Sequence, residues 1–510
     1  MILNYTKTIL LTFVLLTIGK LAYGQQEFTL YHMPSLAQST YLNPAAVPEH
    51  KVSISLPILS GGFGGFNNSA INVKALLSTD GTLDFNRFVE SLDEKKNYLG
   101  AGANAEIFNL RIKAANNFFS LGSRVVADVR FNYPKDLFGL LSEGISGDYS
   151  LSGLALNVNS YIEYAAGYTW AKPDSKWTFG GRVKFLHGLA NIQTKNTDIN
   201  VHVNEAVDDI YTYDVDVDAM VNLGLAVDGD KYNSFEDLSD MVIEDIKDPS
   251  GWGGLELLNL VDEYKPNKGI AMDLGATFQY TKNLSFGASV LNLGFINWKS
   301  FAQNYHIDTQ FTVEGVTAEV DFSADMDSLI NAQVDSLLQF YGDELSDIDT
   351  TYNSYKIGMP TQMFLSANYQ ITPKFRATGS LFTEFHNGVS FGTVVGANYR
   401  FGRSFHLTAS WWWFRKSATN LGIGMVIKPG FGQIFVIFDN VLPAHLVKIS
   451  DPEMGVDNIW LPYQAKNFNV RAGINLVFGK IREESRLPLN GLKKRKDGAR
   501  RYLFKPALKQ

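Results

Sequence analysis

The 510-residue sequence contains no cysteine. This absence excludes a disulfide framework, a lipidated N-terminal cysteine, a thiolate nucleophile and a Cys-ligated metal. No segment beyond the first residues approaches the ~20 consecutive apolar residues that a membrane-spanning helix needs, and a net charge of −7 gives no general attraction to nucleic acid. Aromatic residues, by contrast, make up 13% of the chain, and glycine occurs 44 times. This mixture is typical of many strands with aromatic belts and offers little to a helical protein.

The first residues have the layout of a secretory signal peptide. Lys7 precedes an apolar run over 8–18, and small residues stand at Ala22 and Gly24. We therefore predict a signal peptide over residues 1–24. A membrane anchor is disfavoured because the apolar run is too short to span a bilayer, so we expect the mature chain to leave the cytoplasm.

The strongest pattern in the chain is a repeated alternation of apolar and polar residues with period two. In residues 467–478, NFNVRAGINLVF, every second side chain is apolar, and similar runs elsewhere reach 10–16 residues. A secreted β-sandwich also alternates, but its strands are usually about 5–6 residues long. Transmembrane strands need about 9–11 residues, apolar toward lipid and polar toward the lumen. The pattern predicts an all-β fold, a transmembrane antiparallel β-barrel of the outer membrane of a Gram-negative bacterium.

Turn lengths give the strand count, because short and long connections alternate over the first eight predicted strands and short connections separate the later strands up to residue 441. The predicted strands lie near 51–66, 99–113, 117–131, 153–170, 176–190, 268–281, 284–297, 357–371, 374–386, 389–401, 404–415, 418–428, 432–441 and 466–479. Fourteen is even, which returns both chain ends to the periplasm, and outer-membrane barrels keep their tight turns on that side. The first strand carries a proline and several glycines, so a glycine bend or a lumen-lying segment there is equally possible.

The long connections and the C-terminal tail carry opposite charge. We expect acidic extracellular loops near 191–267 and 298–356, the second with a short helix at 327–342. Calcium ligation is conceivable at DVDVD (214–218) or at SDIDT (346–350), but neither matches the EF-hand pattern, so we predict no metal site. After the predicted barrel, 51–479, residues 480–510 form a basic tail, which is either solvated or bound to an anionic or protein partner in the periplasm.

The block WWW at 411–413 shows how the alternation assigns side chains to the two faces. Trp411 and Trp413 fall on the lipid side and Trp412 on the inner side, where packing against a plug is favoured over ligand stacking. Amphipathic aromatic rings suit the lipid–water interface. The predicted lipid-interface residues are Tyr168, Trp170, Tyr280, Trp411 and Trp413.

Charges of both signs fall on inward positions. The predicted lumen-facing residues are Arg124, Asp128, Arg130, Glu163, Arg182, Lys184, Asp273, Arg376, Glu384, Arg400, Trp412 and Arg471. They form either a structural ion-pair network or a polar permeation path, and the network is favoured because unpaired buried charges are costly. The sequence has no HExxH, P-loop or dinucleotide-binding pattern. We therefore predict no enzymatic activity and no cofactor.

Two segments resemble known outer-membrane families. RAGINLVF (471–478) looks like the terminal β-signal read by the barrel-assembly machinery, with Gly473, Leu476 and Phe478 at its characteristic positions. About thirty residues follow it here, which departs from the usual pattern. LAQSTYLNPAAVPEH (36–50) resembles the segment that opens barrels of the long-chain fatty-acid transporter family and the shuttle barrel of type IX secretion.

The whole chain looks most like an uncharacterised Bacteroidota family of that general shape. The resemblance implies fourteen strands and an N-terminal segment, 25–50, folded into the lumen as a hatch that contains Asn43, Pro44 and Ala45. It carries over no substrate. The hypothesis we favour is passage or binding of a hydrophobic or small solute through a hatch-gated barrel. The alternatives are a non-transporting partner barrel of a secretion or envelope complex, and a secreted all-β binding protein.

Overall fold

The computed structural model describes residues 27–56, 61–69, 85–95, 97–142, 147–204, 212–226, 267–314, 349–385, 389–402, 404–414, 417–441, 446–451, 456–462 and 467–481. The predicted signal peptide, the predicted helix at 327–342 and nearly all of the basic tail lie outside these residues.

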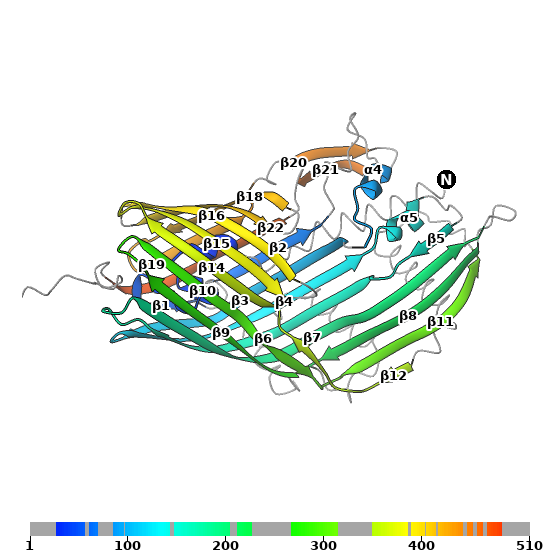
Figure 1. Ribbon diagram of the computed structural model, residues 1–510, viewed down its shortest axis with the longest axis horizontal. Coiled ribbons are helices and arrows are strands. Elements are labelled where there is room, and N and C mark those ends of the chain that lie inside the picture. The colour runs from blue at the N-terminus through cyan, green and yellow to red at the C-terminus, as the bar shows by residue number, and fades with distance from the viewer. Residues whose placement is uncertain are drawn as a thin grey trace, which may run out of the picture.

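The chain forms a closed antiparallel barrel of fourteen strand positions, as the turn pattern predicted (Figure 1). In order around the wall these are β1 (His50–Ser55) with β2 (Gly62–Asn68), β3 (Asn97–Ala114), β4 (Asn117–Tyr133), β6 (Ala155–Trp170), β7 (Trp177–Val203), β9 (Asn267–Gln279), β10 (Leu284–Trp298), β13 (Tyr355–Gly358) with β14 (Thr361–Gln370), β15 (Phe375–Phe385), β16 (Val389–Phe401), β17 (Phe405–Phe414), β18 (Ser417–Ile427), β19 (Gly432–Asp439) and β22 (Asn467–Lys480). Because β1 and β2 each pair with both β22 and β3, the barrel closes at this position.

The first predicted strand is therefore a wall strand in two pieces. β1 ends at Ser55 and β2 begins at Gly62, and both pieces pair with the same two neighbours. The glycine-rich GFGGFNN is part of the wall.

Tight turns gather at one end of the barrel, at the left in Figure 1. Phe401 pairs with Phe405 around Gly402, whose φ is +66°, and β3 turns into β4 through Ala115 at φ +51°. Gly430, at φ +60°, lies in the turn between β18 and β19. The chain enters the wall at His50 and leaves it at Lys480 at this same end, where the two residues pair.

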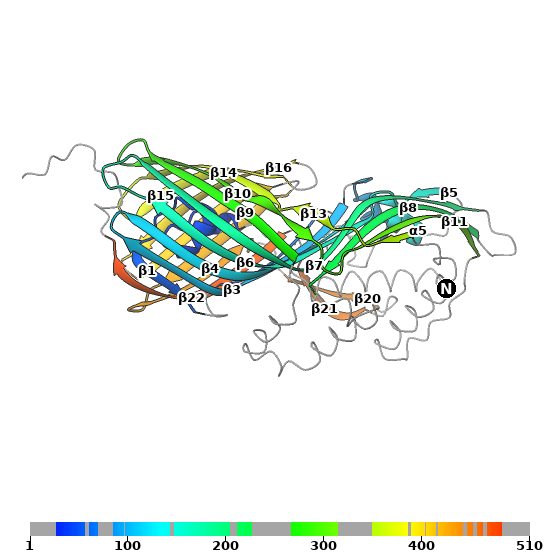
Figure 2. The ribbon, with the colours of Figure 1, turned by 90° about the horizontal axis from the view of Figure 1, so that it is seen from below.

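The opposite end carries the longer connections and a sheet that extends beyond the barrel. β7 is 27 residues long and continues past the wall to pair with β8 (Thr212–Leu225), which pairs with β11 (Gln303–Glu314). β5 (Gly147–Ser150) and β12 (Asp349–Thr351) complete this extension, which we call the arm (Figure 2). The predicted boundaries need correction here, because parts of 191–267 and 298–356 are strands and not loops. The reason is the alternation within DVDVD, which places aspartates on one face and apolar residues on the other.

Short elements lie in the remaining connections. They are the helices α4 (Phe85–Glu90) and α5 (Asp136–Ser142), and a separate hairpin of β20 (Leu446–Asp451) and β21 (Val456–Pro462). Within the described part of the chain, no helix is long and apolar enough to cross a membrane.

The two faces of the wall differ in the way that the alternation requires. Trp411 is 57% and Trp413 43% exposed on the outer face, whereas Trp412 between them is fully buried. Tyr168 and Tyr280 are also exposed, and Trp170 is half-buried. Large exposed apolar side chains recur around the described wall, which suits contact with acyl chains.

The inner face encloses an N-terminal segment. Residues 27–49, which we call the plug, contain the short helix α2 (Phe28–Tyr31) and the 3-10 turn η1 (Ala37–Tyr41), and lie inside the tight-turn half of the barrel (Figures 1 and 2). The largest buried apolar cluster of the described residues lies between the plug and the strands β10 and β14–β19.

Candidate functional site

The first half of the plug rests on an apolar stretch of the inner wall. The Phe28 ring lies 4.9 Å from Trp412, 5.0 Å from Phe382 and 5.8 Å from Phe414, measured between ring centroids. Tyr31 stacks on Phe364 at 4.5 Å. Buried aromatic contacts of this kind contribute both apolar burial and ring–ring attraction, so the plug is held here by packing.

Polar contacts fix the orientation of helix α2 on this surface. The Thr29 amide donates to the Asp439 carboxylate at 2.8 Å, and the Thr29 hydroxyl lies 2.7 Å from the Ser410 hydroxyl oxygen. His32 Nε2 lies 3.1 Å from the Ser380 hydroxyl oxygen. Buried polar groups need such partners. The wall beneath α2 is mainly apolar, but it offers hydrogen-bond partners to the plug at these three positions.

The Asn43–Pro44–Ala45 motif brings the plug backbone very close to the wall. The Asn43 side-chain oxygen accepts a hydrogen bond from the Ala45 amide at 2.9 Å, which holds the turn. Gly180 and Gly275 face this turn. A Cβ on Gly180 would stand only 2.2 Å from a plug atom, and a Cβ on Gly275 only 2.3 Å. The wall therefore has glycine where the plug backbone approaches most closely.

Backbone carbonyls within this motif and on both sides of it accept hydrogen bonds from wall side chains. Ser289 donates to Leu42 at 2.6 Å, Thr169 to Pro44 at 2.7 Å and Arg111 to Ala46 at 3.0 Å. The three donors come from three different strands, so the wall recognises the path of the plug backbone.

A buried ion-pair cluster lies beside the plug. Five of the predicted lumen-facing residues form it: Glu163 lies 2.9 Å from Arg124, 3.2 Å from Arg182 and 3.5 Å from Lys184, and Asp273 lies 2.8 Å from Lys184 and 3.6 Å from Arg182. Tyr41 of the plug places its ring under the Arg124 and Arg182 guanidinium groups, at 5.1 and 4.7 Å. The cluster thus contacts the plug by cation–π interactions.

An ion pair ties down each end of the plug. Arg471, on the closing strand β22, bonds the Glu27 carboxylate, and Lys428 bonds the Glu49 carboxylate at 2.5 Å. Arg471 also donates to Asn104 at 2.6 Å. The plug is therefore clamped at both ends and packed in between, without contributing a strand to the described ladder.

The other predicted inward residues lie apart from these clusters. Arg130 stacks over Tyr98 at 4.7 Å, Glu384 accepts from Gln362 at 3.5 Å, and Arg376 donates to Gln370 at 2.9 Å. Asp128 is half-buried on β4, directly opposite Asn159 of β6, and Arg400 lines a pocket described below. On β22, Gly473 is on the buried face, whereas Leu476 and Phe478 are on the outer face.

The sequence prediction missed five charged residues of the site: Glu27, Glu49, Glu106, Arg111 and Lys428. A signal existed for two of them, because Glu27 and Glu49 are the only acidic residues in 25–50. Among the described residues, no group of three or more His, Asp or Glu side chains is placed to hold a metal ion.

The arm carries a separate open hollow of about 790 Å³, lined by residues of α5, β5, β7, β8 and β11. Hydrogen bonds from Thr312 and Asn204 hold the pKa of Asp214 below its usual range there. The Asp214 carboxylate is therefore charged at neutral pH.

The chain is similar to several solved barrels. These include the CymD monoaromatic hydrocarbon channel (8% identity, TM-score 0.40, 87% of this chain and 93% of that one), a FadL homologue of Pseudomonas aeruginosa (8%, 0.38, 86% and 93%) and the toluene transporter TodX of P. putida (10%, 0.35, 86% and 93%). A comparison with curated proteins found no match. Residues 44–439, well over half of the chain, match a family of unknown function, DUF5723, and the protein therefore belongs to that family.

Proposed function

We propose that the protein is an outer-membrane barrel through which a hydrophobic or small solute passes when the plug moves away from the inner wall. The apolar outer face supports the membrane setting, because side chains such as Leu381, Phe391 and Trp411 are exposed on strand after strand. The tight-turn end would face the periplasm and the arm the outside.

One observation carries the choice of a hydrophobic solute. The lumen of a water-filled barrel is ordinarily polar, yet the inner wall beneath the plug presents Phe364, Phe382, Trp412 and Phe414, all of them buried against it. Displacement of the plug would leave these aromatic side chains facing the passage. An apolar solute would replace the contacts that Phe28 makes, whereas an ion would give up hydration that these rings do not replace.

The way in which the plug is held supports its role as a hatch. It is bound by side-chain packing, hydrogen bonds and ion pairs, and none of the described ladder pairs involves residues 27–49. Moving the plug therefore breaks no strand pairing of the wall. The carbonyls of Leu42, Pro44 and Ala46, once released, are free to bond water.

A reversible covalent lock tests this proposal. The chain has no native cysteine, and the Thr29 and Ser410 hydroxyl oxygens lie 2.7 Å apart. A Thr29→Cys/Ser410→Cys variant places two sulfurs close enough to bond with little rearrangement. We expect proteoliposomes to take up a labelled long-chain fatty acid, the oxidised variant to lose this uptake, and a reductant to restore it.

The two single-cysteine variants are the matched controls, and both should take up the probe in oxidising and reducing buffer alike. Deletion of residues 25–50 should raise uptake above that of the full chain. If the locked variant takes up the probe as fast as the reduced one, the plug does not gate passage.

A partner barrel of an envelope or secretion complex is the second candidate, favoured by the arm. β7 carries 27 residues, far more than a membrane crossing needs, and the arm presents a hollow of about 790 Å³. Co-purification from detergent extracts tests it, with the intact chain compared against Asp214→Asn/Asp216→Asn and against a chain lacking residues 480–510. A partner lost with either change would support docking.

A further inference from the structure

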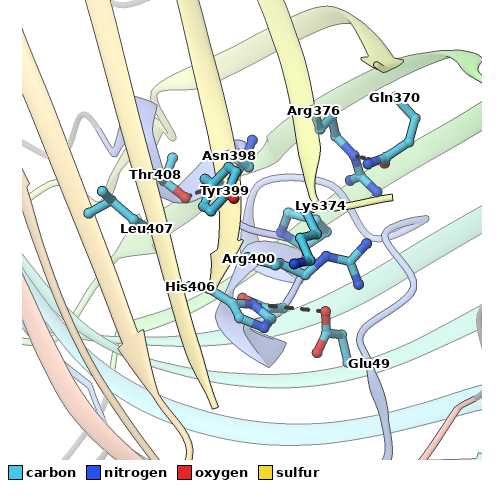
Figure 3. A pocket seen from close by; sticks show the side chains of 12 residues that line it. Glu49, Gln370, Lys374, Arg376, Asn398, Tyr399, Arg400, His406, Leu407 and Thr408 are labelled. Carbon is cyan, nitrogen blue, oxygen red and sulfur yellow. Dashed lines mark hydrogen bonds and ion pairs between the residues drawn. The ribbon is translucent and has the colours of Figure 1, made fainter. Parts of the chain in front are cut away.

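A small pocket of about 40 Å³ lies on the seam between the plug and the wall, at the tight-turn end (Figure 3). Pro34, Ser35 and Glu49 of the plug line one side, and residues of β14 to β17 line the other. The volume exceeds the roughly 10–15 Å³ that a single water requires. The pocket therefore admits a group of several heavy atoms.

Positive charge dominates the side chains around this pocket. Lys374, Arg376 and Arg400 line it, against the single carboxylate of Glu49. Lys428 lies 2.5 Å from that carboxylate, and its positive charge balances the negative charge of Glu49. Among the described residues at the pocket, four cationic side chains thus face one anionic side chain, which makes it attractive to an anion.

Hydrogen bonds hold two of the donor side chains of the pocket in place. Gln370 accepts from Arg376 Nε at 2.9 Å, which orients the guanidinium, and Asn398 stands directly opposite Arg376 across β15 and β16. The Asn398 side-chain oxygen accepts from the Thr408 hydroxyl at 2.8 Å. Its side-chain nitrogen is buried and has no hydrogen-bond partner among the described residues. A buried donor without an acceptor is unfavourable, and a ligand oxygen would relieve this.

We infer that this pocket is an oxyanion site that binds a phosphate group. Guanidinium groups match the oxygens of phosphate in both charge and geometry, and the Asn398 amide supplies a neutral donor. Two sources share this chemistry: free inorganic phosphate, and the headgroup of a phospholipid at the periplasmic rim.

Plug and wall each supply part of the pocket. The complete site therefore exists only while the plug is packed against the wall, which we call the seated state. A phosphate group bound there stabilises the seated state by linkage. This coupling rests on the proposed function, whereas the binding itself does not.

Titration calorimetry on the full-length protein in a phosphate-free maltoside detergent tests the site. One arm titrates inorganic phosphate and the other titrates dihexanoyl phosphatidylglycerol, both at constant ionic strength. We expect one saturable site. Arg376→Gln/Arg400→Gln should weaken binding by roughly tenfold or more, since two charge-assisted bonds are lost. Asn398→Leu should weaken it less, because only one neutral donor is lost.

Glu49→Gln provides a change of opposite sign. It removes the only carboxylate among the described residues of the pocket lining and releases the Lys428 ammonium. The packing of Phe28 and the pair of Glu27 with Arg471 still hold the plug, so binding should become tighter, which a misfolded protein would not show. Lys282→Gln is the control for loss of a positive charge away from the pocket, because Lys282 is exposed in the turn between β9 and β10, and it should leave binding unchanged.

The two titration arms identify the source of the phosphate group. Variant-sensitive binding of phosphate alone assigns the free ion, and variant-sensitive binding of the lipid alone assigns the headgroup. The proposal is overturned if neither ligand saturates, or if Arg376→Gln/Arg400→Gln binds as tightly as the native chain, which would indicate an adventitious ion only.

Discussion

The backbone of Pro44 lies against Gly180 so closely that a Cβ on the glycine would stand 2.2 Å from the Pro44 carbonyl carbon. Gly180→Ala must therefore push the plug away from β7. Overpacking of this kind costs about 1–3 kcal/mol, and the plug, which is not part of the ladder, should move before the wall does. We expect faster hydrogen exchange across residues 27–49, with the exchange of β7 itself unchanged.

Gly181→Ala is the matched control on the neighbouring residue. Its Cβ would lie 3.8 Å from the nearest atoms, which is ordinary contact. Exchange in the plug should stay at the native rate. Equal exchange rates in the two alanine variants would mean that the Asn43–Pro44–Ala45 turn does not rest on Gly180.

Glu163 should be far more important to stability than an ordinary surface acid. It is 2% exposed and contacts Arg124, Arg182 and Lys184, so Glu163→Gln leaves buried cations with too little negative charge. Breaking a buried pair costs about 3–5 kcal/mol. Equilibrium unfolding in urea with lipid vesicles should show a loss of this size.

The same substitution at Glu94 is the control, because Glu94 pairs with Lys135 while 76% exposed. Exposed pairs contribute about 0–1 kcal/mol. A loss at Glu163 as small as that at Glu94 would show that the buried cluster is not needed to hold the barrel.

The three consecutive tryptophans should respond differently to brominated lipid, which quenches only indoles that meet acyl chains. Trp411 and Trp413 are exposed on the outer face, and Trp412 is buried against Phe28. Replacing Trp411 or Trp413 by Phe should therefore reduce the quenchable fraction of fluorescence, and Trp412→Phe should not. A drop with Trp412→Phe equal to that with Trp411→Phe would contradict the alternation.

The wall of the barrel was predictable because strand alternation is a local property. The face on which a side chain lies follows from the alternation within its own segment, as it does for Trp411, Trp412 and Trp413, and turn lengths then give the number of strands. Because the signal is local, the end of β7 was not predicted. Beyond Ala190 the alternation no longer has to satisfy lipid on one side, so residues up to Val203 read as a polar loop.

The contacts of the plug could not be predicted from local patterns. Arg471 meets Glu27 across 444 positions, and Thr29 meets Asp439 across 410. Nothing within either segment specifies its partner. Alternation placed Arg471 on the inner face, but the closure of the barrel decides which carboxylate it reaches.

In the arm, we expect one substitution to increase stability. Asp218 of β8 stands directly opposite both Asp198 of β7 and Asp308 of β11, and like charges in that position repel. Asp308 is exposed, so Asp308→Asn should stabilise β11 by about 0.2–1 kcal/mol, measured as slower hydrogen exchange of its amides. The gain in stability should fall at ~1 M salt, where the Debye length is about 3 Å and the repulsion between the carboxylates is screened. Asp174→Asn, in the turn between β6 and β7, should have no such effect. A gain that persists at high salt would point to a cause other than charge repulsion.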